Sequence, residues 1–352
     1  MDSSILIFLS SGLFLGWSLG ANDAANVFGT AVGSRMVRFG TAALICSICL
    51  TAGAVIGGAG ASHGLGKLGS IATLPGAFTV ALAAAATVLW MTRAGLPVST
   101  SQAIVGAIVG WNMFASVTTD KAVLSKIAMT WVACPILGAI FAMVLYQLLK
   151  GCIYLFKPHL LRQDQLTRYG LVLAGALGSY SLGANNIGNV MGVFVPSSPF
   201  SDITLIGGIT LNSTQQLFLL GGIAISVGVF TYSKKVMMTV GDSLMPLTPV
   251  AALVVVVSHS LVLFVFSSTT LRDTLVSMGL FKIPLIPVSS SQAVIGAVIG
   301  IALLKGMRGV RQVRWGVLVN IAGGWVMTPI AAAILCYVLL FVMQNVFNQA
   351  VM

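Results

Sequence analysis

Charged residues are scarce in this chain, and one kind is missing altogether. Only 7% of the 352 residues are charged, and the seven acidic residues are all aspartates because the sequence contains no glutamate. A soluble domain carries about 25% charged residues, so this scarcity excludes an ordinary soluble fold. Hydrophobic residues make up 57% of the chain, and apolar runs of about 18 residues or more recur along it. The sequence therefore predicts an all-α polytopic membrane protein.

Cysteine is sparse as well, and the five cysteines do not form a recognisable site. Cys46 and Cys49 make a C-x-x-C pair inside an apolar run, with no second pair and no histidine nearby. We interpret them as small packing residues and expect no metal site, redox site or cofactor there. The first apolar run also lacks the basic flank and cleavage site of a removable signal peptide.

Basic residues outnumber acidic ones, and the formal net charge is +11. Such a charge could indicate a nucleic-acid partner. In membrane proteins, however, lysine and arginine collect on the cytoplasmic side. That bias explains the charge, so we expect a lipid bilayer and no nucleic acid.

Three sequence elements occur twice in the same order. These are LGANDAANVFG (Leu19–Gly29) and LGANNIGNVMG (Leu182–Gly192), LPVSTSQAIVGAIVG (Leu96–Gly110) and IPVSSSQAVIGAVIG (Ile286–Gly300), and WVACPI (Trp131–Ile136) and WVMTPI (Trp325–Ile330). Such repetition predicts two homologous halves. We place the first at residues 1–150 and the second at 169–352, joined by a polar cytoplasmic connecting loop at 151–168.

Hydropathy gives each half the same series of apolar segments. We expect them at about 4–33, 39–61, 72–92, 96–116 and 124–150, and again at about 168–195, 203–231, 245–266, 284–304 and 315–343. In each half the third and fourth segments are expected to form a re-entrant-like hairpin that enters and leaves on one side. Each half then crosses the membrane three more times, so the second half has the opposite orientation.

The distribution of basic residues supports this topology if both termini lie outside. The residues that then fall inside are Arg35, Arg38, Lys150, Lys157, Arg162, Arg168, Lys234, Lys235, Lys305, Arg308, Arg311 and Arg314. Only Lys67, Lys121 and Lys126 fall in outer loops, while Arg93, Arg272 and Lys282 lie at the hairpin bends. The excess inside follows the positive-inside rule. Inverted repeats with broken helices are typical of secondary transporters whose sites lie near the membrane midplane.

The two repeated polar motifs are the candidate site. Each GAN motif interrupts an apolar run with glycine and asparagine, which we interpret as unwound backbone lining a cavity. Each P-V-S-x-S-Q motif is typical of a helix start. Free backbone N–H groups and hydroxyls at such helix starts favour anion binding.

One acid stands out among the seven. Asp2, Asp120, Asp164, Asp202, Asp242 and Asp273 can all be placed in tails, loops or hairpin bends, whereas Asp23 lies deep in an apolar run. No lysine or arginine lies in the middle of an expected membrane span to pair with it. An intramembrane acid costs at least about 2.5–3.5 kcal/mol and is by default functional. We expect Asp23 to serve a cation, Na⁺ or a proton; a neutral aspartic acid hydrogen-bonded between helices is the alternative.

Together these motifs resemble the PiT-type inorganic phosphate transporters, and the resemblance covers both halves. It implies an inverted-repeat fold, a homodimer, and coupling of Na⁺ or H⁺ to anion uptake. It also implies that the anion is surrounded by Ser99, Thr100, Ser101, Gln102, Ser289, Ser290, Ser291 and Gln292. The residues it implies for the coupling cation are Asn22, Asp23, Asn26, Asn185, Asn186 and Asn189, with Na⁺ at Asp23.

The second GAN motif departs from the family pattern. The family usually repeats GAND in both halves, but here Asn186 replaces the expected acid. Asparagine offers a carbonyl oxygen to Na⁺ but brings no charge and carries no transported proton. We therefore expect fewer coupling cations than in a member with two aspartates, or an altered substrate.

The motifs leave the anion and the class of protein open to alternatives. Hydrogenphosphate has a proton that a carboxylate such as Asp23 could accept, which favours phosphate, while sulfate remains the alternative. An anion channel is a further alternative, although polarity concentrates at two points rather than along a pore. A hydrolase using the motif serines would need an activating base, which neither motif contains.

His259 in VVVVSHSLVL is expected to be a packed histidine bonded to a hydroxyl, or else a proton relay.

Overall fold

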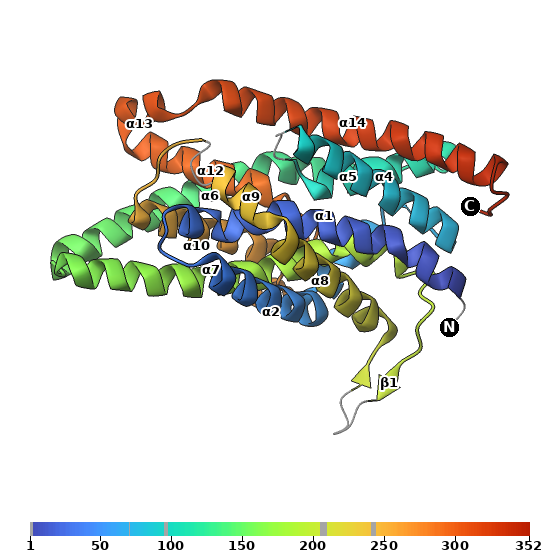
Figure 1. Cartoon of the computed structure of the whole chain (residues 1–352), viewed down its shortest axis with the longest axis horizontal. Helices are drawn as coiled ribbons and strands as arrows, with labels where there is room; N and C mark the ends of the chain where they lie inside the picture. The colour runs from blue at the N-terminus through green and yellow to red at the C-terminus, as the bar shows by residue number, and fades with distance from the viewer. Residues whose placement is uncertain (1–2, 70, 95–97, 205–209, 241–243) are drawn as a thin grey trace.

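The structure is a computed structural model that describes residues 3–69, 71–94, 98–204, 210–240 and 244–352. Leu96 and Pro97 of the first P-V-S motif, together with Asp2 and Asp242, lie outside the described residues. The described chain forms a bundle of long α-helices that run along the longest axis of the molecule (Figure 1).

The helices of the described residues fall into two series along the chain. The first contains α1 (Ser3–Gly33), α2 (Phe39–Gly57), α3 (Ala59–Gly66), α4 (Leu74–Arg93), α5 (Thr100–Phe114) and α6 (Lys121–Phe156). The second contains α7 (Leu160–Met191), the 3-10 turn η1 (Gly192–Phe194), α8 (Ser213–Thr231), α9 (Ser233–Val240), α10 (Pro249–Ser267), α11 (Thr269–Ser277), α12 (Ser290–Leu304), α13 (Gly306–Gln312) and α14 (Trp315–Asn345).

Seven helices of the described residues are long and apolar enough to cross a membrane. They are α1, α2, α4, α6, α8, α10 and α14. The polytopic helical class predicted from the sequence is confirmed. Helices α5 and α12 are shorter, and they pair with α4 and α10 as the two expected hairpins.

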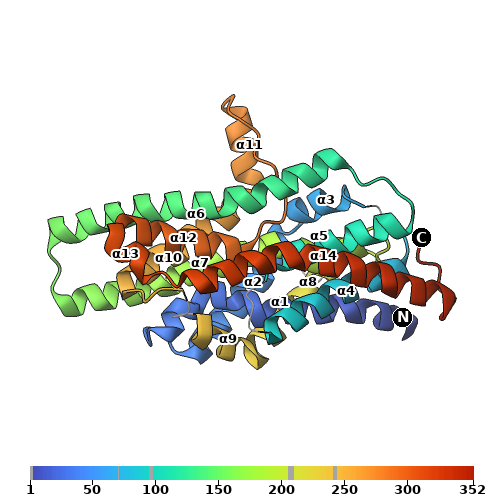
Figure 2. The same ribbon diagram turned by 90° about the horizontal axis from the view of Figure 1, so that it is seen from above.

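Helices of the first series pack against helices of the second series in matching pairs. Helix α1 packs on α8 as α7 packs on α2, and α5 packs on α14 as α12 packs on α6. Equivalent helices run in opposite directions, since α1 is antiparallel to α7 and α6 to α14 (Figures 1 and 2).

Glycine allows the closest of these contacts, and it explains the third repeated element. A Cβ at Gly106 on α5 would collide with the backbone of Pro329 on α14. In the matching place, a Cβ at Gly296 on α12 would collide with the backbone of Pro135 on α6. Both prolines lie inside their helices. Small residues are the usual means of close helix approach in lipid, so each WVxxP element is the docking surface for the other half's hairpin.

The expectation of unwound backbone at the GAN motifs is wrong. Residues 3–33 and 160–191 are continuous α-helix through both motifs. A Cβ at Gly20 would collide with the Ile225 carbonyl oxygen, and one at Gly183 would collide with that of Leu50. The glycines therefore serve close helix packing and not a helix break. The breaks occur elsewhere, between α2 and α3 at Gly58 and between α8 and α9 at Tyr232.

Two further segments differ from the hydropathy prediction. Within the expected apolar segment 203–231, β1 (Ile203–Thr204) and β2 (Thr210–Leu211) pair antiparallel and project from the bundle (Figure 1). The polar stretch 151–168 is largely helical, because α6 extends to Phe156 and α7 begins at Leu160. Only residues 157–159 connect them: Lys157 takes a left-handed conformation (φ 42°) and His159 caps α7. Polar residues do not prevent a helix from continuing into water.

Candidate functional site

Both P-V-S-x-S-Q motifs begin a helix, as their sequences predict. Ser99 and Ser289 have extended backbone and cap α5 and α12. Each serine hydroxyl accepts a hydrogen bond from the backbone N–H of the glutamine three residues later, at 3.3 Å in both cases. The remaining N–H groups of each first turn create a positive helix end.

The two hairpin tips touch each other. Ser101 Oγ, in the first turn of α5, donates a hydrogen bond to the Val288 carbonyl oxygen at 3.0 Å. Val288 immediately precedes the cap of α12. The positive ends of two helices from opposite halves therefore meet in the interior of the bundle.

The GAN segments of α1 and α7 hold these tips from the side. Asn22 Nδ2 donates to the Val98 carbonyl oxygen at 3.2 Å, and the Val288 N–H donates to Asn185 Oδ1 at 2.9 Å. Each equivalent asparagine thus bonds to the residue before the cap in its own half.

A second asparagine in each motif reaches the hairpin of the other half. Asn26 Nδ2 donates to Ser290 Oγ at 3.0 Å, and Asn189 Nδ2 donates to Ser101 Oγ at 2.8 Å. The sequence-predicted residues therefore form one continuous cluster, and none of them is more than 8% exposed.

Asp23 lies inside this cluster without a cationic partner. Its side chain is 2% exposed and accepts a hydrogen bond from Asn22 Nδ2 at 2.8 Å. No lysine or arginine of the described residues forms an ion pair with it. Among the described residues, this buried carboxyl group therefore has a neutral hydrogen-bond donor beside it and no cation.

Asn186, the counterpart of Asp23, is bonded within the protein. Its Oδ1 accepts from Asn189 Nδ2 at 2.9 Å and from Ser101 Oγ at 3.5 Å, and its Nδ2 donates to the Leu182 carbonyl at 3.3 Å. The two GAN motifs are thus chemically different at matching positions: one presents a carboxylate and the other a neutral, occupied amide.

Several polar atoms of the cluster are buried without a hydrogen-bond partner among the described residues. They are Thr100 Oγ1, Gln102 Oε1, Asn185 Nδ2, Asn189 Oδ1 and Gln292 Oε1. Each buried unsatisfied group costs about 1–3 kcal/mol, so such a concentration indicates a place for a polar ligand. Three of these atoms are amide oxygens, which seek a donor or a cation. Ser289 and Ser291 instead bond to each other at 3.2 Å.

His259 joins the cluster although it lay outside the residues predicted for the site. It is fully buried on α10, and its Nε2 lies 2.9 Å from Ser290 Oγ. The packed histidine bonded to a hydroxyl is therefore confirmed, and Ser290 links it to Asn26. The interrupted apolar run around His259 was the signal for this position.

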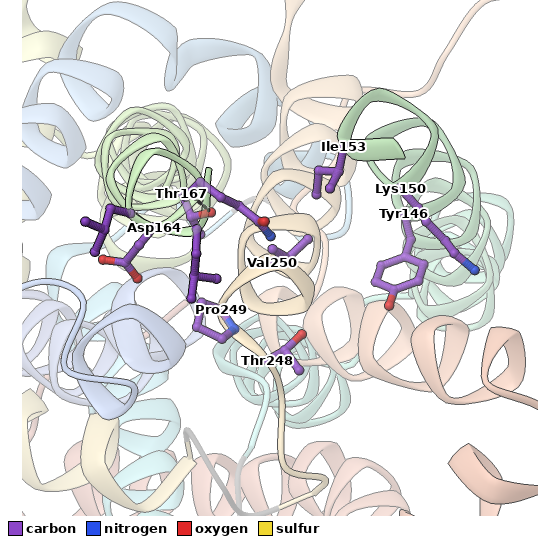
Figure 3. Close-up of a pocket in the computed structure, with 11 residues that line it drawn as sticks. Tyr146, Lys150, Ile153, Asp164, Thr167, Thr248, Pro249 and Val250 are labelled. Atoms are coloured by element: carbon purple, nitrogen blue, oxygen red, sulfur yellow. Dashed lines mark hydrogen bonds between the residues drawn. The ribbon is translucent and has the colours of Figure 1, made fainter. Parts of the chain in front are cut away.

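Other features of the chain lie away from the cluster. A cavity of about 600 Å³ between α6, α7 and α10 is lined by residues such as Tyr146, Asp164 and Thr248 and contains none of the predicted site residues (Figure 3). Within the described residues no group of three or more His, Cys, Asp or Glu could hold a metal. Cys46 is buried on α2, as a packing residue would be.

Comparison with known proteins gives consistent matches along the chain. The profile of the phosphate transporter family matches residues 19–336. A protein of Methanocaldococcus jannaschii named as a candidate phosphate permease is 26% identical over 339 residues, covering 96% of this chain and 98% of its own. One of Helicobacter pylori with the same description is 28% identical over 382 residues, covering 86% of this chain and 69% of its own.

One solved structure shares the fold. It is described as the sodium-dependent phosphate transporter, and it superposes with a TM-score of 0.73 at 24% sequence identity. The match covers 97% of this chain and 99% of that chain.

The fold and the buried site define a class, that of multi-pass helical membrane transporters, which are not enzymes. Within that class, the chain belongs to the phosphate transporter family, as the paired motifs predicted. The motif serines therefore belong to a transport protein and not to a hydrolase.

Proposed function

We propose that this protein is a Na⁺-coupled symporter that imports inorganic phosphate by alternating access. The observation that carries this proposal is the cluster of buried, unpartnered polar atoms beside an aspartate that has no cationic partner among the described residues. A cation and an anion bound together would satisfy both groups. The likeness in fold to a protein described as sodium-dependent supports Na⁺ over H⁺ as the coupling ion.

The cation in this proposal is Na⁺ near Asp23. Hard cations prefer oxygen ligands, and the GAN motifs offer the Asp23 carboxylate and the unpartnered amide oxygen of Asn189. Asn186 adds no charge, and its oxygen already accepts hydrogen bonds. We therefore infer that Asp23 provides the one charged coupling position of the two GAN motifs.

The anion would lie between the hairpin tips. The first turns of α5 and α12 supply N–H groups, and Thr100 and Ser290 supply hydroxyls. Neutral donors at positive helix ends suit a small oxyanion. Phosphate is favoured over sulfate because hydrogenphosphate can donate its proton to a nearby acceptor, whereas sulfate cannot.

The two halves, residues 1–150 and 169–352, would be inverted repeats with both termini outside. Their antiparallel equivalent helices and matched contacts support this inversion (Figures 1 and 2). Since no predicted site residue is more than 8% exposed, release to either side requires movement of the hairpins against the other helices, as alternating access requires. The homodimer implied by the resemblance remains a prediction.

Uptake of labelled anions into proteoliposomes tests the proposal. Phosphate and sulfate are offered separately, each with a Na⁺ gradient or a pH gradient imposed alone. We expect saturable phosphate accumulation above equilibrium under the Na⁺ gradient, with sulfate as a poor substrate. Preferred sulfate uptake would change the anion, and accumulation only under the pH gradient would change the coupling ion. Equilibration without accumulation would point to a channel.

A further inference from the structure

A second feature of the chain is a cavity bordered by three lysines and an arginine, which the buried cluster does not include. The cavity has a volume of about 740 Å³. It lies between α3, the beginning of α6, α11 and the segment that follows α11. We call it the basic vestibule, and its charged lining residues are Lys67, Lys126, Arg272 and Lys282.

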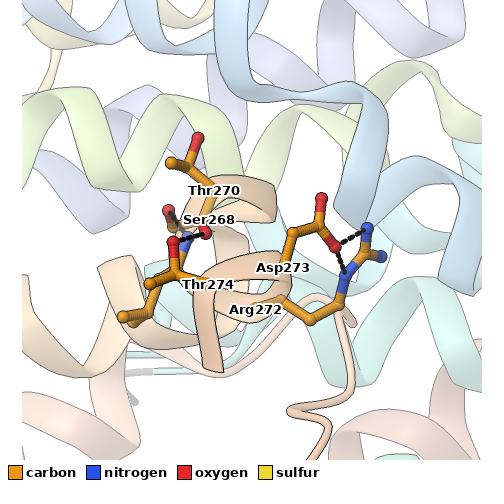
Figure 4. A network of polar contacts seen from close by, with 6 residues as sticks. Ser268, Thr270, Arg272, Asp273 and Thr274 are labelled. Atoms are coloured by element: carbon orange, nitrogen blue, oxygen red, sulfur yellow. Dashed lines mark hydrogen bonds and ion pairs between the residues drawn. The ribbon is translucent and has the colours of Figure 1, made fainter. Parts of the chain in front are cut away.

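The charge of this vestibule is positive and only partly compensated. Arg272 forms an ion pair with its neighbour Asp273 at 2.7 Å, on the helix α11 that projects from the bundle (Figures 2 and 4). Lys67, Lys126 and Lys282 are exposed, and none of the three forms an ion pair with a described residue. The residues that line the vestibule include no acid.

The wall of the vestibule leads directly to the buried cluster. Its lining includes residues 283–286, and Ile286 lies two residues before Val288, the acceptor of the Ser101 hydrogen bond. On the other side it includes Ala59 and Gly60 at the start of α3. A Cβ at Gly58, just before α3, would collide with Ile187, the neighbour of Asn186. The lining of the vestibule is therefore continuous along the chain with segments that contact the GAN and P-V-S motifs.

These three lysines come from positions far apart in the sequence, yet they share one face. Lys67 and Lys126 belong to loops predicted to lie outside, and Lys282 lies near the predicted hairpin bend. Their convergence on one cavity agrees with a common side of the membrane. Positive-inside anchoring does not account for a basic cluster on the side that should be poor in lysine.

We propose that the basic vestibule is a capture site for small divalent oxyanions, which it concentrates before they pass to the buried cluster. This inference rests on the proposed function. A cleft lined by one sign of charge raises the local concentration of its counter-ion and the rate of encounter. Exposed lysines hold an anion loosely, because each ammonium is strongly hydrated and mobile. The anion can then pass to the buried cluster when residues 283–286 separate from α3.

Kinetics of the triple variant Lys67→Gln/Lys126→Gln/Lys282→Gln test the proposal. Phosphate uptake is measured in proteoliposomes of zwitterionic lipid at fixed Na⁺, with ionic strength raised by choline chloride from about 20 mM to about 500 mM, which shortens the Debye length well below that of physiological salt. The triple arginine variant keeps the charge. Lys121→Gln removes a nearby exposed lysine of α6 that does not line the vestibule.

The glutamine variant should raise KM for phosphate by about five- to tenfold at low ionic strength, within the range of electrostatic steering. Its maximal rate should stay near that of the wild type, and the difference in KM should fade at high salt. The arginine variant and Lys121→Gln should keep the wild-type KM.

Three results would overturn the capture site. The first is an unchanged KM for the glutamine variant in an assay in which the wild type transports phosphate. The second is a loss of maximal rate that salt does not affect, which would indicate a structural role. The third is an effect that arises only when anionic lipid is added to the vesicles, which would assign the lysines to lipid headgroups. Absence of phosphate uptake by the wild type would instead overturn the proposed function, and the capture site with it.

Discussion

Asn189 Nδ2 donates a hydrogen bond to Ser101 Oγ over 2.8 Å, and this bond joins the GAN helix of the second half to the hairpin tip of the first. Its counterpart joins Asn26 to Ser290 at 3.0 Å. Each hairpin tip is therefore held by a helix from the other half. A displacement of one half relative to the other must change the contacts of both tips together.

Replacement of Ser290 by alanine should weaken phosphate binding. The Ser290 hydroxyl bonds to Asn26 and His259, and we expect it to contact the anion. Loss of a hydrogen bond to a charged group costs about 1.5–3 kcal/mol, which corresponds to at least about a tenfold rise in KM. The measurement is the concentration dependence of phosphate uptake.

Ser258→Ala is the matched control for this substitution. Ser258 is also buried on the hairpin, but its hydroxyl bonds back to the Val254 carbonyl of its own helix at 2.7 Å. Uptake by this variant should stay within about twofold of wild type, because the loss of a side-chain hydrogen bond to the backbone of the same helix has a small effect. Equal KM values for the two variants would exclude Ser290 from the anion site.

Asn186→Asp should raise the ratio of cations to phosphate transported. The amide oxygen of Asn186 accepts from Asn189 and Ser101, and a carboxylate at this place would add a buried charge that requires a cation. The ratio is measured from the membrane potential at which net phosphate flux vanishes under known gradients. An unchanged ratio in a functional, folded variant would show that the asymmetry of the GAN motifs does not set the stoichiometry.

Gly106→Ala and Gly296→Ala should each destabilise the fold. The added methyl group of either variant would meet the backbone of a proline in a helix of the other half, and overpacking of this kind costs about 1–3 kcal/mol. The loss is measured as a lower unfolding temperature in detergent. Gly151→Ala on α6 is the control, because nothing lies within 4 Å of its added carbon. Equal stability of all three variants would contradict the docking of each hairpin on the other half's WVxxP element.

The sequence predicted the parts of the site that depend on local chemistry and repetition. Ser99 and Ser289 cap helices because a hydroxyl after Pro-Val satisfies the first free N–H groups, and that relationship is local. Duplicated motifs in one order predicted that the two hairpins are equivalent. Their direct contact through Ser101 and Val288 is a tertiary fact consistent with that prediction.

Local rules failed where tertiary packing decides the backbone. Gly20 and Gly183 predicted unwound segments because glycine lowers helix propensity, yet the neighbouring helices α8 and α2 come too close for any side chain there. The membership of His259 in the cluster was not predicted, because one histidine in an apolar run does not reveal which helix its ring faces. Residues 203–204 and 210–211 pair as strands that project from the bundle, and hydropathy alone cannot separate such a segment from a membrane helix.

The most direct test of the account is gradient-driven phosphate uptake by Asp23→Asn. Asparagine preserves the size of the side chain but removes the one buried carboxylate of the site. The variant should remain folded, with an unfolding temperature near that of wild type, and should fail to accumulate phosphate above equilibrium under a Na⁺ gradient. Accumulation of phosphate above equilibrium by this variant under the same Na⁺ gradient, at the wild-type level, would contradict the central role of Asp23.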